Sequence, residues 1–158
     1  MTKELKQEFT LRISQANKTQ IIVLVYEIAL SYIEDAKQDF ADKRMEDYKK
    51  SVQKAQNCIA QLMESLNFEH EISFHLMQLY TYVNRELIHA VVKKEDSHLS
   101  AAKDVLTALH ESFLEISKTD ASRPMMENAQ EVYAGLTYGR NDLTENLNDE
   151  GASRGFRI

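Results

Sequence analysis

The sequence predicts an all-α protein, an antiparallel up-down-up-down four-helix bundle with an irregular C-terminal tail. No glycine or proline precedes Pro124, so residues 1–123 lack both of the strongest helix breakers. Apolar residues recur every three or four positions instead of alternating, which is typical of amphipathic helices. The connections between the predicted helices are only a few residues long, and this makes consecutive helices antiparallel. A coiled-coil rod is the weaker alternative.

The first bundle helix is predicted at residues 18–41. Asn17 is a favourable N-cap residue, and Gln20 follows it at the spacing of a capping box. The run from Ile21 to Ile33 is apolar on nearly every side. Such a helix needs neighbours on more than one face.

The second and third helices are predicted at residues 43–66 and 68–94. Asp42 and Asn67 are polar residues suited to N-caps. The third helix is apolar over a wide arc because it carries two stripes. One stripe consists of Ile72, Leu76, Leu79, Val83, Leu87 and Ala90, and the other of Met77, Tyr80, Asn84, Ile88 and Val91.

The fourth helix is predicted at residues 97–118, starting beside Asp96, with a narrower apolar stripe. Residues 1–17 form an N-terminal segment outside the bundle. Residues 119–158 form a tail that holds every glycine and the one proline. We expect this tail to be partly helical or disordered.

Composition excludes several classes of protein. The net charge of -6 and the pI near 5.4 argue against a general nucleic-acid binder, which needs a basic face. The single cysteine, Cys58, cannot form an internal disulfide, which favours a reducing compartment. The N-terminus lacks the apolar core of a signal peptide, and the apolar run from Ile21 is too short for a membrane span. We therefore expect a cytoplasmic protein that does not insert into membranes.

The candidate chemistry is weak. The pattern Glu-x-x-His occurs at Glu86 with His89 and at Glu95 with His98, a spacing used by ferritin-like di-metal bundles. The first pair lies off both apolar stripes and the second spans a predicted turn, so we interpret all four as surface residues. Cys58 lies beside an apolar stripe and is expected to be buried and inert. We expect no metal site, no cofactor and no enzymatic activity.

Surplus apolar helix surface is the stronger signal. A fully buried aliphatic side chain gains roughly 1.5–3 kcal/mol, so such a surface is costly to leave in water. Either the first helix sits centrally in the bundle, or a groove receives an amphipathic segment of a partner.

The run IIVLVYEIAL resembles the first-helix signature of the FliS family of flagellin export chaperones. AQLMESLNFE, LYTYVNREL and AAKDVLTALHESF resemble later parts of the family in the same order, so the resemblance covers about residues 10–118. The double glycine that the family carries after its second helix is absent. The resemblance implies a non-catalytic cytoplasmic chaperone. It would bind the disordered, apolar C-terminal region of flagellin, prevent premature polymerisation and deliver flagellin to the flagellar export machinery.

The resemblance also implies functional positions, because Tyr26, Leu79, Tyr80 and Tyr82 match signature positions of the family. With the apolar residues expected beside them in the groove, the partner-binding residues on the first three bundle helices are Ile22, Leu24, Tyr26, Leu62, Leu66, Leu76, Leu79, Tyr80 and Tyr82. In the family, the segment before the first helix can lie over part of the binding surface. Phe9, Leu11 and Ile13 would be the apolar contacts of that cap here.

The tail carries further spaced apolar residues, Tyr133, Leu136 and Tyr138. They could fold back on the empty groove or reach a second copy of the chain, and a disordered extension without a role is the alternative. Two other functions remain open: a ferritin-like di-metal protein, which metal analysis would identify, and a structural helical dimerisation protein, which solution mass would identify.

Overall fold

The computed structural model describes residues 1–126, and all regular secondary structure in this range is helical. The helices are α1 (Lys3–Gln15), α2 (Lys18–Ala41), α3 (Met45–Glu64), α4 (Ile72–Lys93) and α5 (Asp96–Thr119). The predicted all-α bundle is confirmed. The N-terminal segment, for which the sequence analysis predicted no helix, contains α1.

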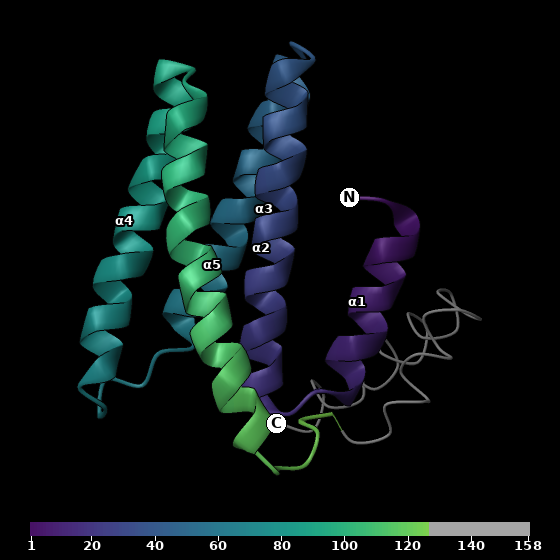
Figure 1. Cartoon of the computed structure of the whole chain (residues 1–158), viewed down its shortest axis with the longest axis vertical. Coiled ribbons are helices and arrows are strands. Elements are labelled where there is room, and N and C mark those ends of the chain that lie inside the picture. Colours follow the sequence, from purple (N-terminus) through teal and green to yellow (C-terminus); the bar gives the residue numbers. More distant parts are fainter. Residues whose placement is uncertain (127–158) are drawn as a thin grey trace, which may run out of the picture.

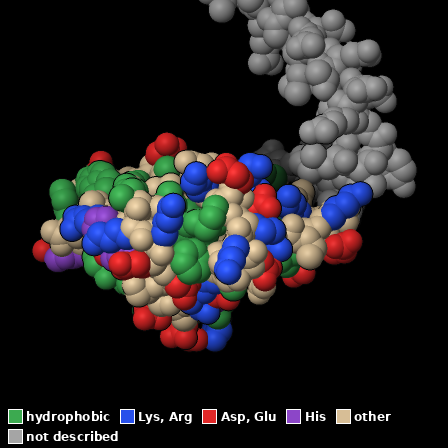
Figure 2. All heavy atoms as spheres, turned by 90° about the horizontal axis from the view of Figure 1, so that it is seen from above, with side chains coloured by type: hydrophobic (Ala, Val, Ile, Leu, Met, Phe, Trp, Pro, Cys, Tyr) green, Lys and Arg blue, Asp and Glu red, His purple; other side chains and the backbone are tan. Residues whose placement is uncertain are grey.

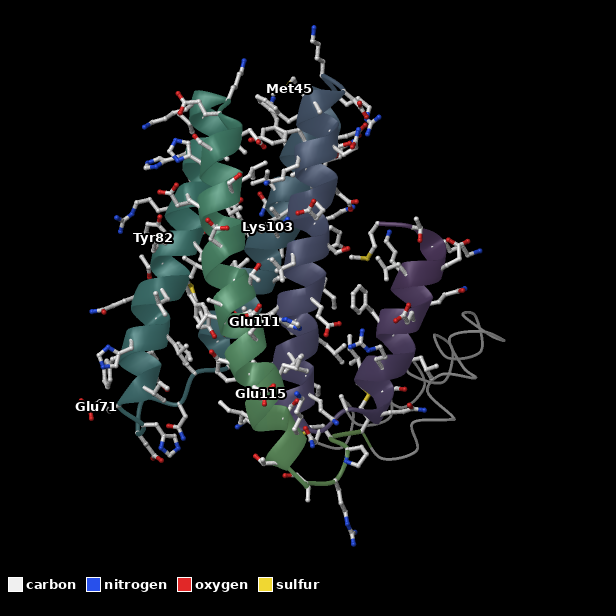
Figure 3. All side chains as sticks on the ribbon, in the orientation of Figure 1. Met45, Glu71, Tyr82, Lys103, Glu111 and Glu115 are labelled. Carbon is white, nitrogen blue, oxygen red and sulfur yellow. The ribbon has the colours of Figure 1, made fainter. Side chains whose placement is uncertain are left out.

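Helices α2 to α5 form the bundle, and consecutive helices run in opposite directions (Figure 1). Each packs on the next, and α5 closes the ring by packing on α2. Met45 at the start of α3 and Glu71 before α4 lie at opposite ends of the bundle (Figure 3). Helix α1 stands outside this ring, and the one helix it contacts in the described part of the chain is α2.

The start of α2 follows the predicted capping chemistry. The Asn17 side chain accepts a hydrogen bond from the Gln20 backbone N–H at 2.9 Å, and the Gln20 side chain accepts one from the Asn17 N–H at 2.9 Å. Both groups would otherwise lack partners at the helix end. This capping box fixes where the chain turns from α1 into α2.

The predicted cap at Asp42 is wrong. Asp42 ends α2, and the next residue, Lys43, has a left-handed backbone with a φ of 59°. Helix α3 therefore begins at Met45, two residues later than expected. Asn67 likewise lies in the turn before α4, where its side chain accepts a hydrogen bond from the Glu69 N–H at 3.0 Å.

The bundle core contains three fully buried tyrosines, each with a partner for its hydroxyl group. The Tyr48 hydroxyl donates to the Ala90 carbonyl at 2.8 Å. The hydroxyls of Tyr26 and Tyr80 share a hydrogen bond of 2.5 Å across the centre of the bundle. Cys58 is buried in this core, as expected, and burial raises its pKa to about 11.

A second apolar cluster, Phe9, Ala16 and Leu24, lies outside the bundle core, between α1 and α2. Ile21 and Ile28 of α2 are partly buried against it. Helix α2 thus has one apolar face turned into the bundle and another turned toward α1. This arrangement explains how a helix apolar on nearly every side is covered.

No helix among residues 1–126 combines the length and the apolar character that crossing a membrane requires.

Candidate partner-binding surface

The α1-facing side of α2 is the first part of the candidate surface. Ile21, Leu24 and Ile28 are three and four residues apart, so they share one face of the helix. Leu24 is 3% exposed, and Phe9 of α1, which packs in the same cluster, is 7% exposed. Removing α1 would uncover this face without breaking the core formed by the four bundle helices.

A polar contact also fastens α1. Arg12 of α1 pairs with Glu27 of α2 through nitrogen–oxygen distances of 2.6 and 3.1 Å, and the Nε2 atom of His110 on α5 lies 3.2 Å from Glu27. We call these three residues the Glu27 clasp. Partial burial of Glu27 works against ionisation, but the hydrogen bonds from Arg12 and His110 outweigh it and lower the pKa of Glu27. The clasp therefore favours a charged Glu27 and a docked α1.

A cleft of ≈ 360 Å³ opens where α1, α2 and α5 come together near the end of α5. Its lining is mixed polar and apolar: Arg12, Gln15, Ala16, Gln20, Val23, Leu24, Leu114 and Ser117. Leu24 belongs both to this lining and to the second apolar cluster. The cleft thus gives access to one edge of the surface that α1 covers.

The described part of the tail passes near this site. The Met125 N–H donates to the Ala16 carbonyl at 3.0 Å, and the Asn17 side chain donates to the Asp120 carbonyl at 3.3 Å. These bonds hold the segment after α5 against the junction of α1 and α2. The predicted self-docking residues Tyr133, Leu136 and Tyr138 lie outside the described residues.

Exposed apolar side chains on and before α4 form the second part of the candidate surface. On α4, Leu79 and Tyr82 are 38% and 39% exposed, and Tyr82 is labelled on this helix in Figure 3. The other large exposed side chains in this region are Phe68, Ile72, Phe74, Ile88 and Val92. Figure 2 looks onto the end of the bundle opposite the start of α4, and hydrophobic side chains reach the surface there among acidic and basic ones.

The structure separates the expected partner-binding residues into four groups. Tyr26, Leu62, Leu76 and Tyr80 are buried in the bundle core, where they cannot touch a partner in this conformation. Leu24 is buried beneath α1.

Ile22 and Leu66 are partly buried and pack against the bundle core. Leu79 and Tyr82 are exposed. Direct contact with a partner is therefore open to Leu79 and Tyr82 as the structure stands, and to Leu24 once α1 moves.

The residues expected in the cap differ in their contacts. Phe9 is buried in the second apolar cluster, and Ile13 is partly buried against it. Leu11 is half-buried and is not part of that cluster. In the apolar attachment of α1, Phe9 is the buried large side chain, and Met1, Leu5 and Ile13 are partly buried around it.

Sequence reasoning missed the exposure of Ile72 and Ile88, which it assigned to apolar stripes. Ile72 is 61% exposed and Ile88 is 45% exposed. Phe68 and Phe74 were not singled out, although their rings lie 5.2 Å apart between centroids and both are exposed. The excess of apolar residues around α4, beyond the width of one stripe, was the available signal.

Comparison with known proteins gives two matches. The family model described as flagellar protein FliS matches residues 1–120. A curated relative, the flagellar secretion chaperone FliS of Bacillus subtilis (strain 168), is 26% identical over 101 residues, which cover 64% of this chain and 76% of the relative. The family match includes α1 as well as the four helices of the bundle.

Proposed function

The chain belongs to the FliS family of flagellar proteins, and we propose that, as a flagellar export chaperone of this family, it binds the apolar C-terminal region of flagellin. In this proposal it keeps newly made flagellin from polymerising and delivers it to the export apparatus. The protein acts by binding, and no catalytic step is involved.

One observation carries the proposal: α2 has a second apolar face, centred on Leu24, that packs on α1 rather than in the bundle core. That face is covered by α1, which contacts α2 and no other helix among residues 1–126. A helix attached to a single neighbour can leave while the rest of the fold remains. The covered face then becomes available to an apolar segment of another chain.

The client would replace α1 by contacts of the same kind. An amphipathic helix with apolar residues three and four positions apart matches the spacing of Ile21, Leu24 and Ile28. Further apolar residues of the client would contact Leu79 and Tyr82 on α4. Because these two groups lie on different helices of the ring, the client would wrap around the bundle rather than insert into it.

Energetics favour reversible binding. The client must order itself as it binds, and coupled folding of this kind costs about 2–5 kcal/mol of the gross interaction free energy. It must also displace α1, whose burial of Phe9 opposes binding. Both costs keep the affinity moderate, so the client can be released for export.

Titration calorimetry of the full chain with a C-terminal flagellin peptide tests the proposal. We expect saturable binding at micromolar concentrations, with one peptide per chain. A matched pair of variants locates the contact: Leu79→Glu should weaken binding, while Gln78→Glu, at the neighbouring exposed position, should not. Absence of heat and of any fluorescence change at micromolar concentrations would refute flagellin binding.

A further inference from the structure

The two Glu-x-x-His pairs, assigned to the surface from sequence, come together where α4 turns into α5. His98 Nδ1 lies 2.7 Å from a carboxylate oxygen of Glu86, and His89 Nδ1 lies 4.0 Å from the other. The rings of His89 and His98 meet edge to face with their centroids 5.3 Å apart. One ligand atom from each of these three residues lies within 4.8 Å of the other two.

The helices hold these side chains in place. Glu86 and His89 are three residues apart, so they share one face near the C-terminal end of α4. His98 lies in the first turn of α5, next to the fully buried Leu99. None of the three is fully exposed: the side chains of Glu86 and His98 are 15% and 18% exposed, and that of His89 is 37% exposed.

We propose that Glu86, His89 and His98 form a binding site for one divalent transition-metal ion of the zinc class. Zinc binds imidazole nitrogens at about 2.0–2.1 Å and carboxylate oxygens at about 2.0–2.2 Å, which places neighbouring ligands of a tetrahedral ion roughly 3.4 Å apart. The distances of 2.7 and 4.0 Å on either side of Glu86 bracket this value. The His89 and His98 ligand atoms lie within 4.8 Å of each other, so all three side chains would rotate on their helices to reach a common ion.

The proton balance is simple. A carboxylate can only accept hydrogen bonds, so the Nδ1–H group of His98 donates a hydrogen bond to Glu86 when no metal is bound. When the ion takes Nδ1, the single N–H of a neutral His98 moves to Nε2, so the ring stays neutral and no net proton is released. A second carboxylate, that of Glu95, lies 3.4 Å from the Nε2 atom of His98 on the other side of the ring. A carboxylate at this outer nitrogen orients a metal-binding histidine and raises its basicity.

The choice of metal follows from the ligands. Imidazole groups favour zinc and neighbouring transition metals, whereas magnesium and calcium prefer oxygen ligands throughout. The site differs from a ferritin-like centre, which uses residues of all four helices at mid-bundle and holds two ions. Here the ligands come from two helices at one end of the bundle, so a bound ion would fasten α4 to α5. Three protein ligands leave a fourth position for water.

The test uses the full chain without an affinity tag, after treatment with a chelator. Calorimetric titration with Zn²⁺ should give one site per chain, and Co²⁺ should give the visible absorption of a tetrahedral complex. We expect Zn²⁺ to raise the melting temperature as well, because an ion that binds the folded chain stabilises it. Binding at lower pH should be weaker, because protons compete for the ligands.

Variants assign the ligands. His89→Ala and His98→Ala should abolish the Co²⁺ spectrum, and Glu95→Gln should weaken binding by about 10-fold or more. His75→Ala, an exposed histidine on the same helix, is the matched control and should bind normally. If His98→Ala fails to fold, His89→Ala decides, because the His89 side chain is more exposed. Lack of saturable binding, or binding that survives His89→Ala, would overturn the proposal.

Discussion

Replacing Phe9 by alanine should strengthen flagellin binding, if α1 and the client compete for the same face of α2. Phe9 is 7% exposed and belongs to the apolar cluster that attaches α1. Burial of a side chain of this size contributes about 1.5–3 kcal/mol. Since α1 contacts no other helix among the described residues, this loss falls on the docking of α1 rather than on the bundle.

The size of the effect follows from the equilibrium between docked and released α1. A loss of about 2 kcal/mol shifts that equilibrium roughly 30-fold toward release. When only the released form binds the client, the apparent dissociation constant falls by up to the same factor. Fluorescence anisotropy of a labelled C-terminal flagellin peptide would measure it.

Two further variants separate competition from general loosening. Leu11→Ala alters α1 at a half-buried residue outside the apolar cluster, so it should change the affinity little. Glu27→Gln removes the partly exposed pair with Arg12, which is worth about 0.2–1 kcal/mol, and should strengthen binding by up to about 5-fold. If Phe9→Ala binds the peptide no better than the unaltered chain while the bundle stays folded, α1 does not compete with the client.

Three predictions concern the bundle itself and can be checked by chemical denaturation. Tyr26→Phe should lower the free energy of unfolding by about 1–3 kcal/mol, because it leaves the buried Tyr80 hydroxyl without its partner. The double variant Tyr26→Phe, Tyr80→Phe should recover most of that loss. A single variant as stable as the unaltered chain would refute this. Burial opposes ionisation of Asp39, but the hydrogen bonds from Arg44 and Ser51 outweigh it and lower the pKa of Asp39. Asp39→Asn should therefore destabilise the chain above about pH 4. The difference in unfolding free energy between the variant and the unaltered chain should vanish as the pH falls through that lowered pKa. Burial raises the pKa of Cys58 from 9.0 to about 11, so between these pH values the thiol ionises in the unfolded chain but not in the folded one. This group should therefore lower the free energy of unfolding by about 1.4 kcal/mol for each pH unit in that range. Cys58→Ala should remove this part of the pH dependence.

The helices could be predicted from sequence because each depends on local information. The spacing of apolar residues and the absence of early glycine and proline gave the bundle helices, and Asn17 with Gln20 gave the start of α2. The predicted helix ends were less accurate, because the turn after α2 places Lys43 in a left-handed conformation, where glycine would be the usual sequence signal. The helix α1 was missed because its apolar residues are few and its partner face lies on another helix.

The role of each apolar residue could not be predicted in the same way. A stripe of apolar residues has the same spacing whether it faces the core or a partner, so Tyr26 and Tyr80 were assigned to the binding surface. Their shared hydrogen bond shows that they belong to the interior. Proximity between helices is also not encoded in spacing along one helix, which is why Glu86 and His98 were assigned separately to the surface.

The division of α2 between two faces connects the fold to the proposed function. The face turned inward, which includes Tyr26, packs on α3 and α5 and bonds to Tyr80 of α4, so it cannot be opened without unfolding the chain. The face that includes Leu24 is covered by α1 and its flanking residues, so it can be uncovered at the cost of their apolar contacts, the Glu27 clasp, the pair between the Met1 ammonium and Asp35, and the bond from Met125 to Ala16. A client that supplies more apolar contact than α1 does will displace it, and α1 will cover the face again after the client leaves. The same helix can thus be apolar on both sides without exposing either side in the empty protein.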